Sequence, residues 1–374
     1  MDSTTARNLV MTSSNQVGSF LVRQNKETGI FSVTIRDQDR PRHYHIYKQE
    51  NGMLFVSEQC SFRSISDMVQ HHSKKASGLC STLAKPCIVP HCITDRAEVA
   101  WDKKLASGQI SEVWKGQWKG DAVTVSKVTP GSVSSLDLLD KCAFLKTLGH
   151  ENLIQFRAMH TNSEPFLVIT ERTVYGSLKE YLPSQFESKD FKMSELIKIS
   201  EQVAAAMQYL EGQNCIHQDL AAKNVMIEIN SEETLSIRCK LSIYPYVHKL
   251  NEYGAYYDLS AGTIPIRWSS QDAILKNRIN IKSNVWSFGI FIWEIIHYCR
   301  SYPYPETSEA GVLEKLKQGY RMPRPLGCPV ELYSLMNDCW KGYASSRPTF
   351  EILHQRLKDL HSSDNLGYEE IMFN

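Results

Sequence analysis

Strand-like and helix-like patterns occupy different parts of this chain of 374 residues. Between residues 15 and 90, β-branched and aromatic runs such as GSFLVRQ and IFSVTIRD alternate with turn residues, and one helical stretch follows at 65–73. Strand patterns resume at Trp101 and continue to about residue 171, with one helical stretch near 134–148. Beyond that, apolar residues recur with helical spacing over 193–210, 283–297, 312–318, 331–340 and 350–360. The pattern predicts an α+β chain that ends in a large helical lobe.

The segment 85–95 has two prolines and little periodicity, which indicates a linker. The predicted organisation is a first domain at 3–90, a linker at 91–100, a second domain at 101–362 and a tail at 363–374. A hydrophobic content of 42% is sufficient for several packed cores at this length.

Composition and the ends of the chain exclude several classes of protein. A net charge of +1 provides no global field, so we expect no nucleic-acid partner. The ten cysteines have neither zinc nor disulfide spacing, which predicts reduced and mostly buried thiols. The N-terminus has no signal-peptide core, and the apolar run 288–296 is about half the length of a membrane span. We therefore expect a cytoplasmic chain without stable membrane insertion.

Residues 18–23 read GSFLVR, residues 43–46 read HYHI, and residues 62–83 follow as a helix and closing segment. In this order they resemble an SH2 domain, whose fold is a central antiparallel sheet flanked by helices. The resemblance implies that Arg23 grips phosphotyrosine, because a guanidinium binds phosphate oxygens through two parallel hydrogen bonds. It implies phosphotyrosine proteins as partners, with these binding residues: Arg23, Asn25, His43 and His45.

This SH2-like segment departs from its family in ways that weaken the expected affinity. The family opens with a strand that this sequence lacks, so the domain is N-terminally shortened, and we do not expect Arg7 to replace the second phosphate-binding arginine. The loop after Arg23 is short, with Asn25 where serine is common, and His45 stands where the Src group has lysine.

Residues 217–224 read HQDLAAKN and resemble the HRDLAARN catalytic loop of protein-tyrosine kinases. The resemblance extends from about Trp101 to His361 and implies a bilobal kinase fold, with a β-rich lobe followed by a helical lobe. It implies phosphoryl transfer from ATP to tyrosine, with Asp219 as the base and Asn224 as a magnesium ligand.

The nucleotide-binding part of the resemblance is degenerate. Residues 104–114 align with the glycine-rich loop, but one glycine of three remains. Residues 123–131 (VTVSKVTPG) resemble VAIKTLKPG and place Ser126 at the ATP-binding lysine. Lys127 comes one residue late, so it should face the other side of the strand. The resemblance assigns these residues to the nucleotide pocket: Leu105, Gly108, Val113, Ser126, Lys127 and Thr170.

Other catalytic positions have changed in the same direction. Lys141 stands where the helix glutamate should pair with the ATP-binding lysine, and Ile243 replaces the magnesium-binding aspartate. An aliphatic side chain cannot coordinate a hard cation. Gln218 replaces the arginine that docks a phosphorylated activation loop, whereas Asp272 can still pair with Arg347.

These losses predict a pseudokinase that acts as a phosphotyrosine-dependent scaffold, with ATP and magnesium binding weak or absent. Three alternatives stay open. The chain is a weakly active tyrosine kinase in which Lys127 or Lys141 supplies the missing charge; it binds ATP as a sensor without metal; or it has no stable fold.

Two tyrosines are candidates for phosphorylation. Tyr253 lies in an NEY sequence that resembles the activation loop of Src-group kinases, with Tyr256 and Tyr257 nearby. Tyr368 begins YEEI, which resembles the sequence that Src-type SH2 domains prefer after phosphorylation. We expect phosphorylated Tyr368 to bind the SH2 domain of this chain or of an active Src-type kinase.

Overall fold

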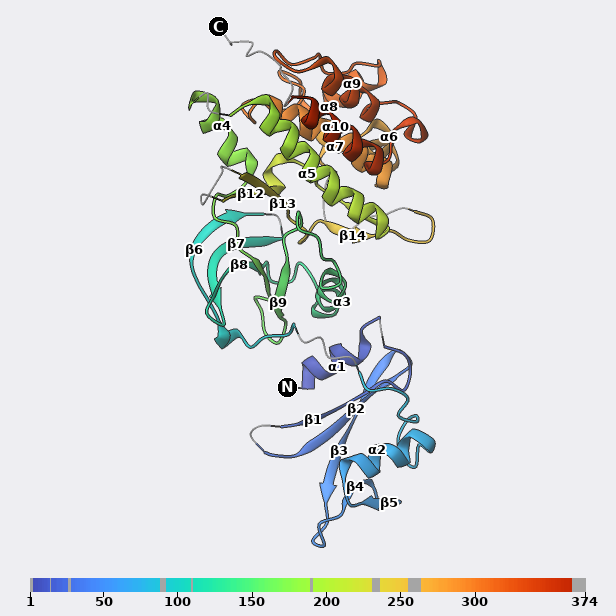
Figure 1. The fold of residues 1–374 in the computed structure, drawn as a ribbon. Helices are drawn as coiled ribbons and strands as arrows, with labels where there is room; N and C mark the ends of the chain where they lie inside the picture. The colour runs from blue at the N-terminus through green and yellow to red at the C-terminus, as the bar shows by residue number, and fades with distance from the viewer. Residues whose placement is uncertain are drawn as a thin grey trace. The chain divides into compact units, whose positions relative to one another are not determined.

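A computed structural model describes residues 3–13, 15–25, 28–87, 92–108, 110–188, 191–230, 236–254 and 264–364. The chain divides into two units, the first made of residues 1–148 and 156–172, the second of residues 149–155 and 173–374 (Figure 1). The first unit contains two five-stranded sheets and the second is mainly helical, as the sequence pattern predicted.

The first sheet of unit one is antiparallel throughout and has the order β1-β2-β3-β4-β5. On one face, Val33 and Ile35 pack with Phe20, Leu79 and Leu83 in an apolar core. Its elements are α1 (Ser3–Met11), β1 (Phe20–Gln24), β2 (Phe31–Asp37), β3 (Arg40–Lys48), β4 (Leu54–Ser57), β5 (Cys60–Phe62) and α2 (Ile65–Lys74). This is the arrangement expected of an SH2 fold.

Helix α1 was not predicted from the sequence, although its buried residues Ala6, Leu9 and Val10 have helical spacing. Arg36 on β2 fixes the end of this helix, since its Nη1 donates to the carbonyl oxygens of Thr12 at 2.8 Å and Asn15 at 2.6 Å. Neighbouring residues of a strand face opposite sides, so the face of β2 that carries Arg36 is the one next to α1.

The second sheet of unit one has the order β6-β7-β8-β10-β9. Its elements are a 3₁₀ turn (Arg96–Glu98), β6 (Val99–Ser107), β7 (Ser111–Trp118), β8 (Asp121–Val128), α3 (Ser135–Leu145), β9 (Phe156–His160) and β10 (Leu167–Glu171). Part of the predicted linker joins this sheet: the Thr94 amide donates to the Met159 carbonyl at 2.8 Å, and the Trp118 indole donates to the Thr94 hydroxyl at 2.8 Å.

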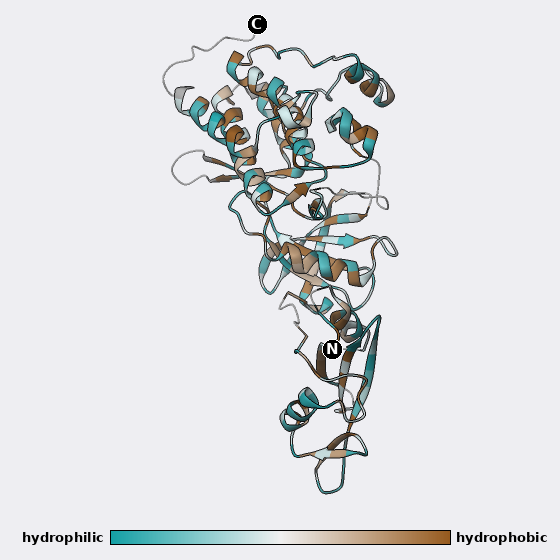
Figure 2. Cartoon of the chain, turned by 90° about the vertical axis from the view of Figure 1, so that its right-hand side faces the viewer, coloured by the Kyte–Doolittle hydropathy of each residue, from teal (hydrophilic) through white to brown (hydrophobic). Residues whose placement is uncertain are grey.

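Unit two is organised around helix α7 (Ile281–Ile296), in which every residue from Ser283 to Ile296 is buried. The helix predicted over 283–297 is thus confirmed, and its apolar run 288–296 is buried. A Cβ atom at Gly289 would lie 2.6 Å from the Trp340 indole nitrogen, so the packing of α7 on Trp340 requires glycine. The helices carry both hydrophobic and hydrophilic residues (Figure 2). No helix in the described part of the chain is long and apolar enough to cross a membrane.

The remaining elements of unit two are α4 (Leu178–Ser188), α5 (Met193–Gly212), β11 (Cys215–His217), η2 (Ala222–Asn224), β12 (Val225–Asn230), β13 (Ser236–Leu241), β14 (Val247–Lys249), η3 (Ile266–Trp268), α6 (Gln271–Lys276), α8 (Glu309–Lys317), α9 (Val330–Cys339), η4 (Ala344–Ser346) and α10 (Phe350–Asp364). The three 3₁₀ turns are those labelled η.

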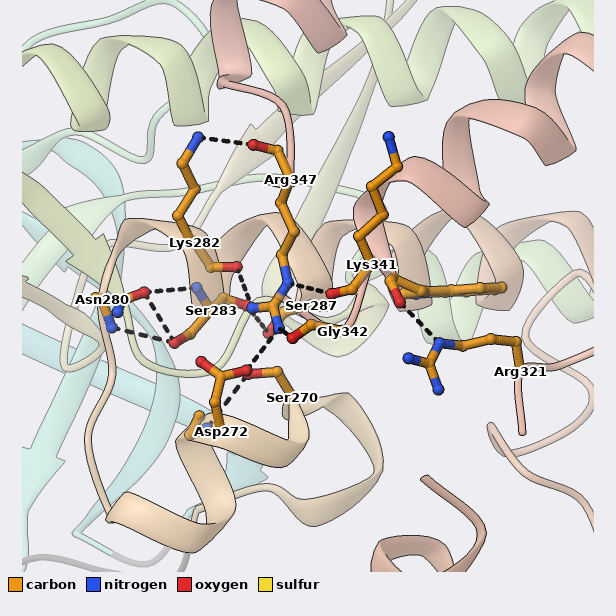
Figure 3. A network of polar contacts seen from close by, with 12 residues as sticks. Ser270, Asp272, Asn280, Lys282, Ser283, Ser287, Arg321, Lys341, Gly342 and Arg347 are labelled. Atoms are coloured by element: carbon orange, nitrogen blue, oxygen red, sulfur yellow. Dashed lines mark hydrogen bonds and ion pairs between the residues drawn. The ribbon is translucent and has the colours of Figure 1, made fainter. Parts of the chain in front are cut away.

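An ion pair between buried Arg347 and half-buried Asp272 joins α6 to the segment before α10 (Figure 3). The Arg347 Nη2 atom lies 2.5 Å from Asp272 Oδ1, which confirms the predicted pair, and the Arg347 side chain is 1% exposed. Arg347 also donates to the carbonyl oxygens of Lys341 and Lys282, both at 2.9 Å. The guanidinium thus donates hydrogen bonds to acceptors from three separate segments of the chain.

Replacing Arg347 with Met should lower the free energy of unfolding by about 3–5 kcal/mol, because Asp272 and the carbonyl oxygens would lose a buried donor. Urea unfolding followed by tryptophan fluorescence measures this change. The control Lys317→Met removes an exposed pair with Glu314 at 2.8 Å and should cost less than about 1 kcal/mol. Equal costs for both variants would contradict the prediction.

Candidate functional site

The loop that carries Asp219 is held by an amide of helix α7. The His217 amide donates to Asn284 Oδ1 at 2.8 Å, and Asn284 Nδ2 donates to the His217 carbonyl at 2.7 Å. The His217 ring is fully buried, with Nε2 2.8 Å from the Ser242 carbonyl. A carboxylate at position 284 could accept the first of these bonds but could not donate the second. Asn284 therefore satisfies both backbone groups of His217.

Asp219 is oriented, but one of its oxygens is engaged. Its Oδ2 atom lies 2.7 Å from Lys223 Nζ, and its side chain is 13% exposed. Asn224 Nδ2 donates to the Asp219 carbonyl at 2.6 Å. The other carboxylate oxygen, Oδ1, is buried and has no hydrogen-bond partner among the described residues. The loop thus holds the Asp219 carboxylate in one orientation, with Oδ2 engaged by Lys223 and Oδ1 buried.

The position of the second magnesium ligand does not fit a metal ion. Ile243 is 1% exposed, and its carbonyl accepts from the Val247 amide at 2.9 Å. Magnesium requires oxygen ligands, and this side chain has none. Of the two positions that the resemblance assigns to magnesium, 224 and 243, only Asn224 has a side-chain oxygen. In the described residues, no group of three His, Cys, Asp or Glu side chains could hold a metal ion.

The register of β8 separates Ser126 from Lys127. Ser126 lies opposite Val113 and Val168, whereas Lys127 lies opposite Glu112 and Leu167, with no bulge in β8 along these pairs. Lys127 Nζ is 4.9 Å from the Trp114 ring centroid, 5.7 Å from that of Trp101 and 3.9 Å from Glu112 Oε2. Its ammonium is therefore stabilised by two aromatic faces and a carboxylate on the side of the sheet away from Ser126.

The two positions directly opposite Ser126 are uncharged. Thr170 lies opposite Thr124 on β8, and both Ser126 and Thr170 are buried. Val113 shares this face because it lies opposite Ser126 on β7. Thr124 shares it because it lies two residues before Ser126 on β8. Ser126 is thus flanked by apolar side chains on both neighbouring strands, while Lys115 on the same face is exposed and lies opposite Thr124.

The remaining predicted nucleotide residues have weaker support. Leu105 lies at a register shift in β6 and is exposed. The Gly108 amide donates to the Ser111 carbonyl at 2.8 Å and closes the hairpin. Lys141 lies on α3 next to the fully buried Cys142. Its ammonium has the opposite charge to the glutamate that the resemblance places at this position.

Glu294 is a site residue that sequence reasoning missed. Its Oε2 atom accepts from the Ala222 amide at 3.1 Å and from the Trp268 indole at 2.7 Å. Burial raises the pKa of Glu294 from its ordinary value of 4.5 to about 7, and the Asp219 charge adds to this effect. A carboxylate inside the apolar run 288–296 was the available signal.

Two other predicted positions are placed by backbone contacts. The Gln218 amide donates to the Tyr246 carbonyl at 2.9 Å. The Tyr253 side chain is 75% exposed, and its carbonyl accepts from Arg278 Nη2 at 3.2 Å. Tyr256, Tyr257 and Tyr368 lie outside the described residues.

The predicted phosphate pocket lies on the SH2 sheet. Arg23 on β1 is opposite Ser32 on β2, and Ser32 is opposite His45 on β3. The Ser32 hydroxyl is 3.1 Å from His45 Nδ1, and the Thr34 hydroxyl is 2.8 Å from His43 Nδ1. The register therefore gathers Arg23, His43 and His45 on one face.

Asn25 has a different position from the other three predicted residues. Its amide donates to the Ile30 carbonyl at 2.9 Å, and its Oδ1 accepts from the Thr28 amide at 3.4 Å. It therefore shapes the turn that follows β1.

Comparisons with known proteins agree with this architecture. The family described as protein tyrosine and serine/threonine kinase matches residues 99–357, and the SH2 domain family matches residues 1–72. The chain therefore belongs to the protein kinase family, in the group that joins an SH2 domain to a tyrosine kinase domain and is homologous to Frk and Src.

Two relatives show how far this similarity extends. The chain is 35% identical to the tyrosine-protein kinase FRK of Homo sapiens over 376 aligned residues, which cover 96% of this chain and 73% of the relative. It is 38% identical to the tyrosine-protein kinase SRK2 of Spongilla lacustris over 368 residues, which cover 94% and 98%.

The raised pKa of Glu294 makes the stability of the chain depend on pH. The folded state keeps a proton that the unfolded state releases between pH 4.5 and about 7, so the free energy of unfolding should fall as pH rises through this window. Glu294→Gln removes the titration and should be more stable than the parent at pH 7.5 by on the order of 1–3 kcal/mol, and by less at pH 5.

Urea unfolding of the parent and Glu294→Gln at the two pH values checks this prediction. Glu314→Gln, at an exposed glutamate paired with Lys317, is the control and should show little difference at either pH. The same stability difference for Glu294→Gln at both pH values would contradict the assignment.

Proposed function

We propose that this chain is a pseudokinase, a kinase-shaped scaffold whose phosphoryl transfer is lost or very slow. The observation that carries this proposal is the position of Lys127. Its ammonium lies against Trp101, Trp114 and Glu112 on the opposite face of β8 from Ser126. It therefore does not supply the missing charge at Ser126.

The magnitude of the loss supports the same conclusion. A removed transition-state donor typically costs about 3 kcal/mol. The missing lysine and the missing metal-binding aspartate at 243 together would slow transfer by roughly 10⁴-fold, although such effects are not additive. Against typical kinase turnovers of about 1–100 per second, little activity is left. The retained Asp219 does not compensate, because a base cannot position the triphosphate.

Transfer of labelled phosphate from ATP to a tyrosine peptide tests this proposal. The parent chain should transfer no faster than Asp219→Ala, and Lys127→Met should not change the rate. The double variant Ser126→Lys, Ile243→Asp restores the lysine and the oxygen ligand, and should bind ATP and magnesium more tightly in a thermal-shift titration. Turnover near one per second in the parent, abolished by Asp219→Ala, would establish the alternative of an active tyrosine kinase.

We propose that the SH2 domain of this chain provides the docking function, by binding phosphotyrosine proteins through Arg23. Support comes from the cross-strand row of Arg23, Ser32 and His45, and from an Arg23 Nε atom that is buried without a hydrogen-bond partner in the described residues. A phosphate oxygen is a strong acceptor for such a donor.

Phosphorylated Tyr368 is the second half of this docking proposal. A labelled peptide of residues 362–374 with phosphorylated Tyr368 should bind Src-type SH2 domains at least about tenfold more tightly than the unphosphorylated peptide, because the phosphate adds charge-assisted hydrogen bonds. Fluorescence polarisation measures both affinities, and this chain is tested alongside with Arg23→Lys as its control. Equal affinity of the two peptides for every domain would exclude a docking role of the tail.

A further inference from the structure

Three hydroxyl side chains lie next to one another on the Ser126 face of the sheet β6-β7-β8-β10-β9. Thr124 and Ser126 are two residues apart on β8 and therefore point to the same side of the sheet. Thr170 on β10 lies directly opposite Thr124. Side chains that lie opposite each other on antiparallel strands have Cβ atoms about 4.5–5.5 Å apart. The three side chains thus form one hydroxyl cluster, next to Val113 and Val168.

The hydroxyl cluster has no protein partner in the described part of the chain. Ser126 and Thr170 are each 7% exposed, and none of the three hydroxyl groups forms a hydrogen bond with another described residue. Buried polar groups in proteins are nearly always hydrogen-bonded. Because a valine would fill the same space without the cost of burying a hydroxyl group, the cluster favours a polar ligand at this face.

An arginine at the end of β10 supplies a further donor without a partner. Arg172 is the first residue after β10 and comes two residues after Thr170, so strand alternation continued by one residue places both on the same face. The Arg172 Nη1 atom is buried and has no hydrogen-bond partner among the described residues. The guanidinium forms no ion pair with these residues either. Leaving a buried charged donor unpaired is costly, so this atom indicates an anionic acceptor.

The charges around the hydroxyl cluster are positive. Lys115 on β7 is exposed and lies opposite Thr124. Asp102 and Lys103 lie across from Lys115 on β6, where the register shifts, and Lys115 forms no ion pair with Asp102 in the described residues. The hydroxyl cluster therefore lies between a cation on β7 and the guanidinium of Arg172 after β10. A ligand with negatively charged oxygen atoms fits this distribution of charge.

We propose that this face of the sheet binds a small organic anion without a metal ion. The guanidinium of Arg172 holds the carboxylate or phosphate group of the ligand through two parallel hydrogen bonds. The hydroxyl cluster donates to the other oxygen atoms of the ligand. No magnesium is needed, because guanidinium and hydroxyl groups donate directly to oxygen. This binding function is separate from phosphoryl transfer and does not depend on its loss.

Thermal-shift titration of the full chain tests the binding, with glutarate and glycerol 3-phosphate as probes. The buffer contains EDTA to remove metal ions, and sodium chloride keeps the ionic strength constant, so that general screening is not counted as binding. A ligand that binds the folded state alone raises the Tm as its concentration increases. At least one probe should give a saturable rise, and the more effective probe identifies the bound group as carboxylate or phosphate.

Substitutions on this face should weaken the binding of that probe. Arg172→Gln should raise its Kd at least about tenfold, because it removes a charge-assisted donor. Thr170→Val and Ser126→Ala each remove one hydroxyl group and should raise the Kd about threefold to tenfold. Arg157→Gln is the matched control, at an exposed arginine on β9 of the same sheet, and should change the Kd less than twofold.

Melting temperatures without probe establish that each variant is folded, and Thr170→Val, which keeps the shape of the side chain, carries the test if Arg172→Gln does not fold. The inference is wrong if neither probe stabilises the parent, or if Arg172→Gln and Arg157→Gln raise the Kd equally. It is also wrong if ATP with magnesium stabilises the parent more than either probe and Arg172→Gln leaves that effect unchanged. The transfer assay with Asp219→Ala decides the pseudokinase proposal separately.

Discussion

Polar side chains of the buried helix α7 hold the loops on which any chemistry of this fold depends. Asn284 fixes both backbone groups of His217, and Ser287 donates to the Trp268 carbonyl at 2.8 Å. Glu294 accepts from Ala222 and Trp268. Buried backbone groups must find partners, so a single helix with three polar positions determines where the catalytic loop and the segment around Trp268 lie.

This arrangement explains how the fold persists while catalytic groups change. None of the three α7 contacts involves position 126, 127 or 243. A buried aspartate without its metal ion would carry a large desolvation cost, whereas buried Ile243 adds apolar contact. The ion pair of Arg347 and Asp272 likewise does not involve position 126, 127 or 243. Stability and phosphoryl transfer therefore rest on separate sets of residues.

The spacing of apolar residues predicted the helices and strands whose own sequence pattern determines their structure. The helix expected at 283–297 is α7 at Ile281–Ile296, and the helix expected at 65–73 is α2 at Ile65–Lys74. Strict alternation also predicted that Lys127 faces away from Ser126, because β8 contains no bulge along its pairs with β7 and β10. Where helical periodicity or strand alternation alone determines the structure, the sequence is sufficient to predict it.

Several features that depend on partners distant in sequence were not predicted. Helix α1 is short and lacks an acidic residue in its first turn, so its propensity signal is weak and its burial comes from the sheet. The role of Glu294 depends on the approach of Trp268, 26 residues earlier in the chain. The pairing of Thr94 with Met159 likewise needs a strand more than sixty residues away. Such contacts follow from tertiary structure, which a local pattern does not contain.

The two sites that the resemblance assigns to phosphate differ in how their cations are used. In the kinase-like domain, Lys127 is satisfied by Glu112 and two indole rings, and Lys223 by Asp219. In the SH2 domain, Arg7 and Arg23 form no ion pair among the described residues. A cation that is already neutralised gains little from a phosphate, whereas an uncompensated one gains the full interaction. Among the described residues, Lys127 and Lys223 are therefore paired, whereas Arg23 on the SH2 sheet keeps a buried donor without a partner.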